Sequence, residues 1–381
     1  METKEILREI ERSETTAIYG AHVVAFGVYT ALRALYGVSV RCFLVTKAEG
    51  SPETVDGVPV LPLREAGLDP ARTLVLIATT ELFHEEIQRE LRALGFERSI
   101  PIGTHEEHLF LSAYFESVGR FSRKAERALL RRASSVGPTP DSVGVYAVRS
   151  QGDKPLRSEA RFSHPVVPIL AGAALSDGPP ADPVNAEAGG RTRLAARSDD
   201  TGENISRKNR RYCELTATYW VWKNATQDVK GIFHYRRHLI LRTGEIDALL
   251  AKEIDAALPL PYLCRKDAKA QFGRFVPEEA WRLLEEAAHD VHSRQCAEIS
   301  RILRGPLLYP YNMLCARAEV FDAYCEWLFP VLFRMEELGR GLPVVEETRA
   351  LAYAGEALTS VYFLLHESAL RVSHAEKRIL V

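Results

Sequence analysis

The chain has 381 residues, 46% of them hydrophobic and 26% charged, which is the ordinary composition of a globular protein long enough for two domains. Its formal net charge of −2 gives no general attraction for a polyanion, so nucleic acid is excluded as the expected partner. Its six cysteines are scattered without a Cys-x-x-Cys pair, which argues against a disulfide framework and against a zinc site.

The N-terminal residues are charged and lack the apolar core of a secretory signal. The longest apolar stretch, residues 166–175, is far shorter than the roughly 20 residues that a membrane-spanning helix needs. We therefore expect a cytoplasmic protein.

Residues 1–138 predict a Rossmann-like module with a parallel sheet. Short apolar strands alternate with helical or turn segments, and are expected at residues 16–19, 38–45, 58–61 and 73–78. A dinucleotide fingerprint after the first strand fails at His22, because that position needs a glycine to let the backbone approach a pyrophosphate. A structural, regulatory or oligomerising role is expected, and an NAD-dependent sugar oxidoreductase is disfavoured.

The predicted boundary between the two domains is the Gly-Pro-Thr-Pro segment at residues 137–140, which breaks a basic helical stretch. The second predicted domain, residues 141–381, begins with a strand at 143–148. Residues 172–197 are rich in Gly, Ala, Pro and Asp, which predicts a long loop that acts as a lid over a bound ligand.

The segment from Ser198 to His238 is the most informative part of the chain. After two acids and a glycine turn, apolar residues return at helical spacing, which predicts one long amphipathic helix over residues 204–224. A short, β-branched strand at 229–233 follows and ends in His-Tyr-Arg-Arg-His. In open α/β sheets, ligands bind at the edge where such strands end.

Arg236 and Arg237 indicate the kind of ligand that this edge would bind. Adjacent guanidinium groups carry fixed positive charge and planar bidentate donors, which match the oxygens of a diphosphate. From spacing alone, solvated or ion-paired arginines at a strand end are an equally good interpretation.

The segment DDTGENISRKNRRYCELTATYWVWKN, followed by GIFHYRRH, closely resembles the signature of the DUF4422 family, bacterial glycosyltransferase-like proteins linked to capsular and other surface polysaccharides. The resemblance extends to YAVRSQGDKPL, PILAGAAL and YPYNMLCARAEVFDAYCEWLFPVLF, and covers most of residues 141–381. It implies an α/β protein with a GT-A-like domain of hexosyltransferase type. This domain would transfer a sugar from a nucleoside-diphosphate donor to a surface-polysaccharide intermediate, and UDP is the expected nucleotide.

The resemblance also implies roles for individual residues. Arg236 and Arg237 would neutralise the diphosphate, with His234 assisting by a hydrogen bond, and Asp200 and Glu356 are the candidates for the base that deprotonates the acceptor. The remaining polar residues expected at the donor site are Asp153, Lys154, Asp199, Asn204, Lys208, Asn209 and Asn312. For Asp153 and Lys154, a polar turn is an equally good interpretation.

GT-A-type enzymes generally present an Asp-x-Asp motif that holds a divalent metal on the donor. This chain has His-Tyr-Arg-Arg at the corresponding strand end, so we expect guanidinium groups to replace the metal. Asp199 and Asp200 remain alternative oxygen ligands for Mg²⁺ or Mn²⁺.

The expected partners are a nucleotide-sugar donor and a glycan or lipid-linked glycan acceptor. Peripheral membrane association and a homo-oligomer are compatible with this interpretation. The main alternative from another class is a non-catalytic nucleotide-sugar-binding protein that regulates or scaffolds polysaccharide assembly.

Overall fold

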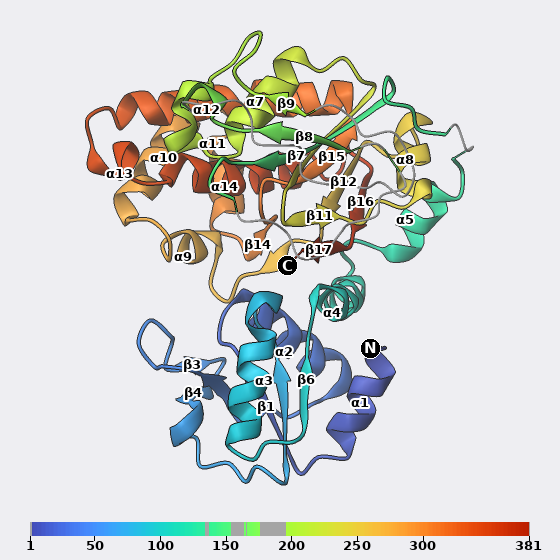
Figure 1. Cartoon of the computed structure of the whole chain (residues 1–381), viewed down its shortest axis with the longest axis vertical. Coiled ribbons are helices and arrows are strands. Elements are labelled where there is room, and N and C mark those ends of the chain that lie inside the picture. Colours follow the sequence, from blue (N-terminus) through green and yellow to red (C-terminus); the bar gives the residue numbers. More distant parts are fainter. Residues whose placement is uncertain (1, 134–136, 154–163, 165, 176–195, 381) are drawn as a thin grey trace. The chain divides into compact units, whose positions relative to one another are not determined.

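The computed structural model describes the whole chain except residues 1, 134–136, 154–163, 165, 176–195 and 381 (Figure 1). The chain divides into two compact units, one made of residues 1–123 with 262–265 and the other of residues 124–261 with 266–381. The sequence placed the boundary at residues 137–140, whereas the structure assigns helix α5 (Arg123–Leu130) almost entirely to the second unit, because its apolar side packs against the core of that unit.

The first unit contains a six-stranded sheet with strand order β3-β4-β2-β1-β5-β6. Every neighbouring pair is parallel except β3 and β4, so the predicted Rossmann-like arrangement is present. The strands are β1 (Thr15–Tyr19), β2 (Phe43–Val45), β3 (Thr54–Val55), β4 (Val58–Pro62), β5 (Thr73–Ile77) and β6 (Ser99–Pro101). The helices are α1 (Thr3–Glu11), α2 (Val23–Tyr36), α3 (His84–Ala93) and α4 (Thr104–Ser117).

The turn between β1 and α2 requires Gly20. Its φ of +116° is unfavourable for other residues, and a Cβ atom there would lie 2.6 Å from the carbonyl oxygen of Ala78. The chain can therefore turn closely over the end of β5 only with glycine at this position.

The second unit contains a nine-stranded sheet whose main order is β16-β12-β15-β10-β7-β8-β9. Strands β7, β8, β9 and β10 are parallel, and β15 runs antiparallel to β10. The main strands are β7 (Val143–Arg149), β8 (Val166–Leu170), β9 (Arg197–Ser198), β10 (Val229–His234), β12 (Ala256–Pro259), β15 (Leu314–Arg317) and β16 (Val372–Ala375). Two short strands, β11 (Arg237–Leu239) and β17 (Lys377–Ile379), extend from the end of β10. The predicted α/β class is confirmed, with parallel-rich sheets in both units.

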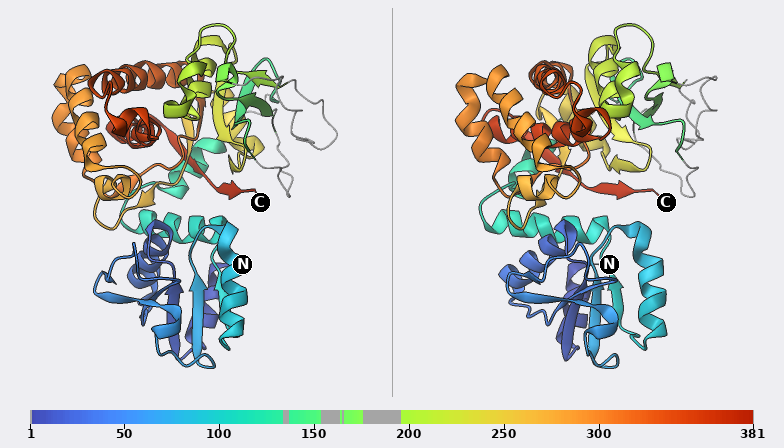
Figure 2. Two further views of the ribbon diagram at one scale, coloured as in Figure 1. Left: turned by 60° about the vertical axis from the view of Figure 1, so that its left-hand side comes forward. Right: turned by 90° about the vertical axis from the view of Figure 1, so that its left-hand side faces the viewer.

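Helices cover both faces of the second sheet. On one face, α5 and α8 (Thr243–Leu250) pack on a cluster that includes Phe233 and Leu239. On the other face lies a larger core, to which α7 (Leu215–Asn224) contributes its aromatic residues. The helices from α10 to α14 gather beside the sheet on that side (Figure 2). These are α10 (Glu278–Val291), α11 (Cys296–Leu303), α12 (Ala318–Leu338), α13 (Pro343–Glu346) and α14 (Ala350–Leu365), with the shorter α9 (Ala268–Phe272) preceding them.

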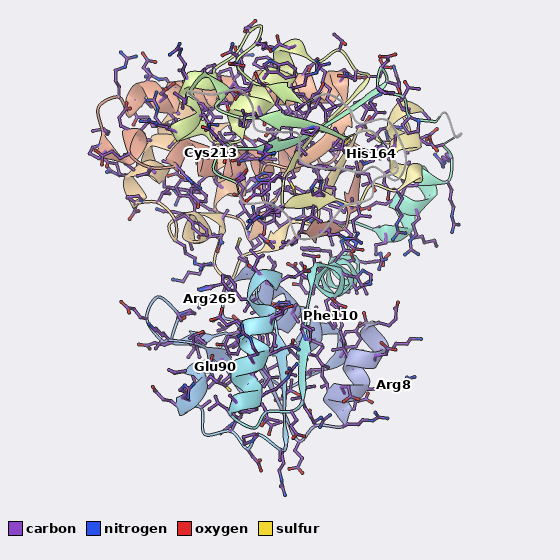
Figure 3. All side chains as sticks on the ribbon, in the orientation of Figure 1. Arg8, Glu90, Phe110, His164, Cys213 and Arg265 are labelled. Atoms are coloured by element: carbon purple, nitrogen blue, oxygen red, sulfur yellow. The ribbon has the colours of Figure 1, made fainter. Side chains whose placement is uncertain are left out.

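The single helix predicted over residues 204–224 is wrong. The structure has a 3₁₀ turn, η4 (Ser206–Lys208), then α6 (Asn209–Tyr212) and α7 (Leu215–Asn224), with a break at Cys213. Cys213 is labelled in Figure 3. Cys213 has a φ of +49°, and Asn209 holds the break by donating to the carbonyl oxygen of Cys213 at 2.7 Å and to the hydroxyl of Thr216 at 3.0 Å. Periodicity did not reveal this break because apolar spacing continues across it.

Candidate functional site

The carboxyl ends of four parallel strands meet at one edge of the second sheet. Strand β10 is the central one, with β7 beside it, β8 beyond and β9 outermost. Because β15 is antiparallel to β10, the segment that enters β15, Tyr311–Asn312, reaches this same edge. This arrangement brings together residues that are far apart in the sequence, and we call it the β10 edge.

Strand β10 ends in a tight hairpin in which His234 pairs with Arg237, leaving Tyr235 and Arg236 at the turn. The guanidinium carbon of Arg236 lies 5.0 Å from the ring centroid of Tyr235, and that of Arg237 lies 4.6 Å from the ring centroid of Tyr311. Both arginine side chains are partly buried by these contacts.

Arg236 and Arg237 form no ion pair with any residue that the structure describes. The Nε atom of each is buried and has no hydrogen-bond partner within the described part of the chain. A buried guanidinium donor without a partner is costly, and buried unpaired donors are rare in folded proteins. No ion pair with a described residue therefore accounts for these two partly buried arginines, and their planar donors suit an anionic ligand.

The Tyr311–Asn312 segment is strained, since both residues have positive φ values, +73° and +51°. Three elements hold it in place. Tyr311 donates its backbone N–H to Oε1 of Glu356 on α14 at 3.0 Å, and its carbonyl oxygen contacts Nε2 of His234 at 2.5 Å. Asn312 donates its side-chain amide to Oε1 of Glu214, just before α7, at 2.8 Å. Strain of this kind concentrates at functional sites.

Glu356 has the proton affinity of a general base. Burial raises the pKa of its carboxyl to about 7, and the negative charge of Glu214 acts in the same direction. The N–H of Tyr311 and the positive charge of Arg237 oppose this shift. A carboxylate with a pKa near neutrality can both accept and release a proton at working pH.

His234 is the neutral partner in this cluster. Burial lowers its pKa, with Arg237 acting in the same direction, while Glu214 opposes the change. Because Nε2 faces a carbonyl oxygen, that nitrogen carries the proton in the neutral ring and Nδ1 is left as an acceptor.

Two members of the cluster were missed from the sequence. Glu214 is the single charged side chain between Arg211 and Lys223. Tyr311 belongs to a Tyr-Pro-Tyr-Asn segment before a strand. A lone carboxylate in an otherwise apolar segment was the signal that could have identified Glu214.

Among the predicted donor-site residues, Asp153 lies at the β10 edge. Its carboxylate accepts from the N–H of Ser150 at 2.7 Å and hydrogen-bonds to the hydroxyl of Tyr235. Lys154 lies outside the described residues, as does most of the predicted lid over residues 172–197. Asn312 is buried, and its amide is used within the protein, so it positions the cluster and leaves no free group for a sugar hydroxyl.

The structure places the other predicted donor-site residues in local contacts. Asn204 accepts from the N–H of Ser206 at 3.2 Å, and Lys208 pairs with Glu336 of α12 at 2.6 Å. Asn209 holds the break before α7, as described above. Asp200 is exposed and accepts a hydrogen bond from the hydroxyl of Ser198. These contacts stabilise the segment between β9 and α7, and the structure does not bring these side chains to the arginines.

Asp199 is fully buried, and its two carboxylate oxygens are occupied by protein donors. They accept from the N–H of Gly172 at 2.9 Å, from the N–H of Ala173 at 3.0 Å and from the hydroxyl of Ser206 at 2.5 Å. Asp199 therefore ties the end of β8 to η4.

Asp199→Ala is expected to lower the free energy of unfolding by about 2–3 kcal/mol, because it leaves buried donors without an acceptor. Urea denaturation of the purified protein measures this change. Asp200→Ala, at the exposed neighbouring position, is the matched control and should leave the denaturation midpoint unchanged. Equal midpoints for Asp199→Ala and the unmodified chain would contradict the structural role.

Asp199 and Asp200 do not fit a divalent metal site, because the carboxylate of Asp199 already accepts three hydrogen bonds from the protein. Within the described ranges, no three His, Cys, Asp or Glu side chains are grouped so that they could bind a metal ion. A separate search of the same ranges finds no helix with the length and apolar character needed to cross a bilayer.

Comparison with known proteins identifies a family. Among curated proteins, none matches the chain. Among solved structures, the WbbM bifunctional glycosyltransferase in its apo state is similar to the chain, with 25% sequence identity and a TM-score of 0.48. The similarity covers 62% of this chain and 45% of that chain, so this chain spans less than half the length of that neighbour. The family model described as a domain of unknown function, DUF4422, matches residues 164–367, which is more than half of the chain. The matched region includes the arginine pair, Glu214 and Glu356. The chain therefore belongs to the DUF4422 family.

Proposed function

We propose that the second unit is a GT-A-like glycosyltransferase that moves a sugar from a nucleoside-diphosphate donor, with UDP as the nucleotide, to a surface-polysaccharide intermediate. The observation that carries this proposal is the pair of partly buried arginines, each with an unpartnered Nε, beside a carboxyl group with a pKa of about 7. The resemblance of the signature segment to surface-polysaccharide glycosyltransferases supports the choice of reaction.

The arginine pair supplies the donor site. A guanidinium group binds phosphate oxygens in a bidentate manner, and two of them match the charge of a diphosphate. As the bond between the sugar and the diphosphate breaks, negative charge accumulates on the leaving oxygen. Arg236 and Arg237 are already fixed in place against Tyr235 and Tyr311, so they stabilise this charge without rearranging.

Glu356 supplies the base. The acceptor hydroxyl oxygen forms a bond to the anomeric carbon, and the electron pair of the old carbon–oxygen bond leaves with the diphosphate. The hydroxyl proton passes to the Glu356 carboxylate, whose raised pKa makes it a stronger base than an ordinary glutamate. Glu214 strengthens this basicity through its negative charge, and the neutral ring of His234 fixes the Tyr311 carbonyl.

The donor chemistry does not require a metal ion in this proposal, because guanidinium groups carry out the charge stabilisation. Thermal unfolding in the presence of EDTA tests the donor class and the metal requirement together. A ligand at a hundred times its dissociation constant stabilises the folded state by about 2.7 kcal/mol, which raises the melting temperature measurably. UDP-sugars should do so in EDTA, and nicotinamide dinucleotides should not.

Three outcomes of this experiment contradict parts of the proposal. Stabilisation that appears only with Mn²⁺ would mean that the donor site depends on a metal. If none of a panel of nucleotide sugars raises the melting temperature, the donor class is wrong. If a nucleotide sugar binds but is neither hydrolysed nor transferred during prolonged incubation, the protein is a non-catalytic nucleotide-sugar-binding protein.

A further inference from the structure

Helix α5 is fixed to the second unit by one of its faces. Leu129, Leu130 and the following Ala133 pack against the cluster that contains Phe233 of β10. On the same side of the helix, the carboxylate of Glu126 accepts from the backbone N–H of His374 at 3.0 Å and contacts the His374 ring at Nδ1, at 2.8 Å. The two leucines and Glu126 are therefore turned toward the protein.

The opposite side of α5, together with the turn that follows the helix at Arg131 and Arg132, carries a basic cluster in which Ala128 is also exposed. Its charged members are four exposed side chains, Lys124, Arg127, Arg131 and Arg132. The first three lie three and then four positions apart, a spacing that places them on one helix face. None of the four forms an ion pair or a side-chain hydrogen bond with a residue that the structure describes. We call these four residues the basic face of α5.

Some arginines of this protein are paired with acids. Arg72 contacts Glu14 at 3.0 Å, and Arg334 contacts Asp290 at 2.8 Å. The basic face of α5 differs because its one acidic neighbour along the helix, Glu126, is engaged with His374 on the inner side. Four positive charges thus remain concentrated within nine residues of the chain.

Helix α5 is also linked to the β10 edge. The other ring nitrogen of His374, Nε2, contacts the Tyr309 hydroxyl at 3.0 Å, and the two rings are stacked with centroids 5.9 Å apart. Tyr309 lies two positions before Tyr311, whose backbone contacts Glu356 and His234. A surface that binds the basic face would therefore be held at a fixed position relative to the β10 edge.

We propose that the basic face of α5 docks the protein on an anionic membrane surface. Each Lys or Arg side chain of a cluster near an anionic bilayer contributes favourably to the free energy of binding. At moderate salt, this attraction falls off within about 10 Å of the surface. A membrane is favoured over nucleic acid because the chain as a whole has a formal charge of −2 and the basic residues form one compact face. The docking is independent of the donor chemistry proposed above, and a lipid-linked acceptor would be presented at the same surface.

Cosedimentation of the full chain with phospholipid vesicles tests this proposal. At low salt, the protein should bind vesicles containing about one third phosphatidylglycerol and should not bind vesicles of phosphatidylcholine alone. Binding should weaken steeply as salt is added. Reversing the four charges, K124E/R127E/R131E/R132E, should lower the partition coefficient at least about a hundredfold, since each basic residue contributes about a factor of five or more.

A matched control variant distinguishes an effect of the basic face of α5 from an effect of the overall net charge. It reverses four exposed arginines elsewhere on the second unit, Arg282, Arg294, Arg301 and Arg340, to glutamate. Both variants change the net charge equally, and both should keep the melting temperature of the unmodified chain. The control should still bind anionic vesicles.

The proposal is wrong if the unmodified chain does not bind anionic vesicles, or if the control variant loses binding as completely as the α5 variant. Binding to heparin that depends on α5, without binding to vesicles, would identify a soluble polyanion as the partner and would likewise overturn it. None of these readouts uses sugar transfer, so failure here is distinguishable from failure of the proposed glycosyltransferase activity.

Discussion

Replacing Glu356 with glutamine is expected to lower the turnover number of sugar transfer by about 10²–10⁴-fold, the usual contribution of a positioned general base. The amide oxygen can still accept from the N–H of Tyr311, so the strained turn should remain in place. Donor binding should change little, because the arginine pair is untouched. Measuring the turnover number and the dissociation constant for the donor separately tests this result.

The pH dependence provides a second readout of the same residue. Because the pKa of Glu356 is raised to about 7, its carboxyl is protonated and inactive as a base below that pH and ionised above it. The rate of the unmodified enzyme should therefore increase with pH through about 7 and then level off. In Glu356→Gln this rising limb should be absent.

Glu347→Gln is the matched control, because Glu347 is exposed on the segment that precedes the helix of Glu356. It should retain both the turnover number and the pH profile. If Glu356→Gln keeps its activity while Asp200→Asn loses it, the base is Asp200, and the assignment of Glu356 is wrong.

The double substitution R236A/R237A is expected to have the second large effect, on binding of the nucleotide-sugar donor. A hydrogen bond to a charged group contributes about 1.5–3 kcal/mol, so losing both arginines should weaken donor binding by about 10²–10⁴-fold. Calorimetric titration with the best nucleotide sugar from the thermal panel measures this change. The lysine pair R236K/R237K should recover only part of the affinity, because lysine keeps the charge but loses the bidentate geometry.

The same double substitution should not destabilise the protein. Each Nε is buried without a partner, so removing these charges relieves a desolvation cost, and the free energy of unfolding should stay the same or rise. Arg301→Ala, at an exposed position on α11, is the control for a general effect of lost charge. Unchanged donor affinity in R236A/R237A would refute the diphosphate site, and a large fall in the melting temperature would indicate a structural role for the pair.

The sequence was sufficient to predict the short strand β10 and the position of the arginine pair at its end. Strand length, β-branched residues and the flanking turn are local properties, and the parallel neighbours of β10 follow from the alternation of strands and helices. The same reasoning failed for the helix before it. The break at Cys213 depends on the Asn209 side chain bonding to the backbone, a competition that hydrophobic periodicity does not register.

The candidate site was only half predictable for a similar reason. Glu356 was identified as a candidate base by resemblance, but its raised pKa arises from burial and from Glu214, which is distant in the chain. Asp199 was expected at the donor site from the resemblance, and the structure instead uses it to accept hydrogen bonds from Gly172 and Ala173. Whether an acid is free or occupied is set by partners that spacing does not reveal.

The sequence by itself determined the α/β class, the family and the strand end that carries two adjacent arginines, because these depend on residue order over short distances. Only the tertiary structure decided which charges are left without a partner and which carboxyl has a raised pKa. Those properties depend on burial and on contacts such as that between Asn312 and Glu214, which lie 98 positions apart and meet only when the sheet and its helices have assembled.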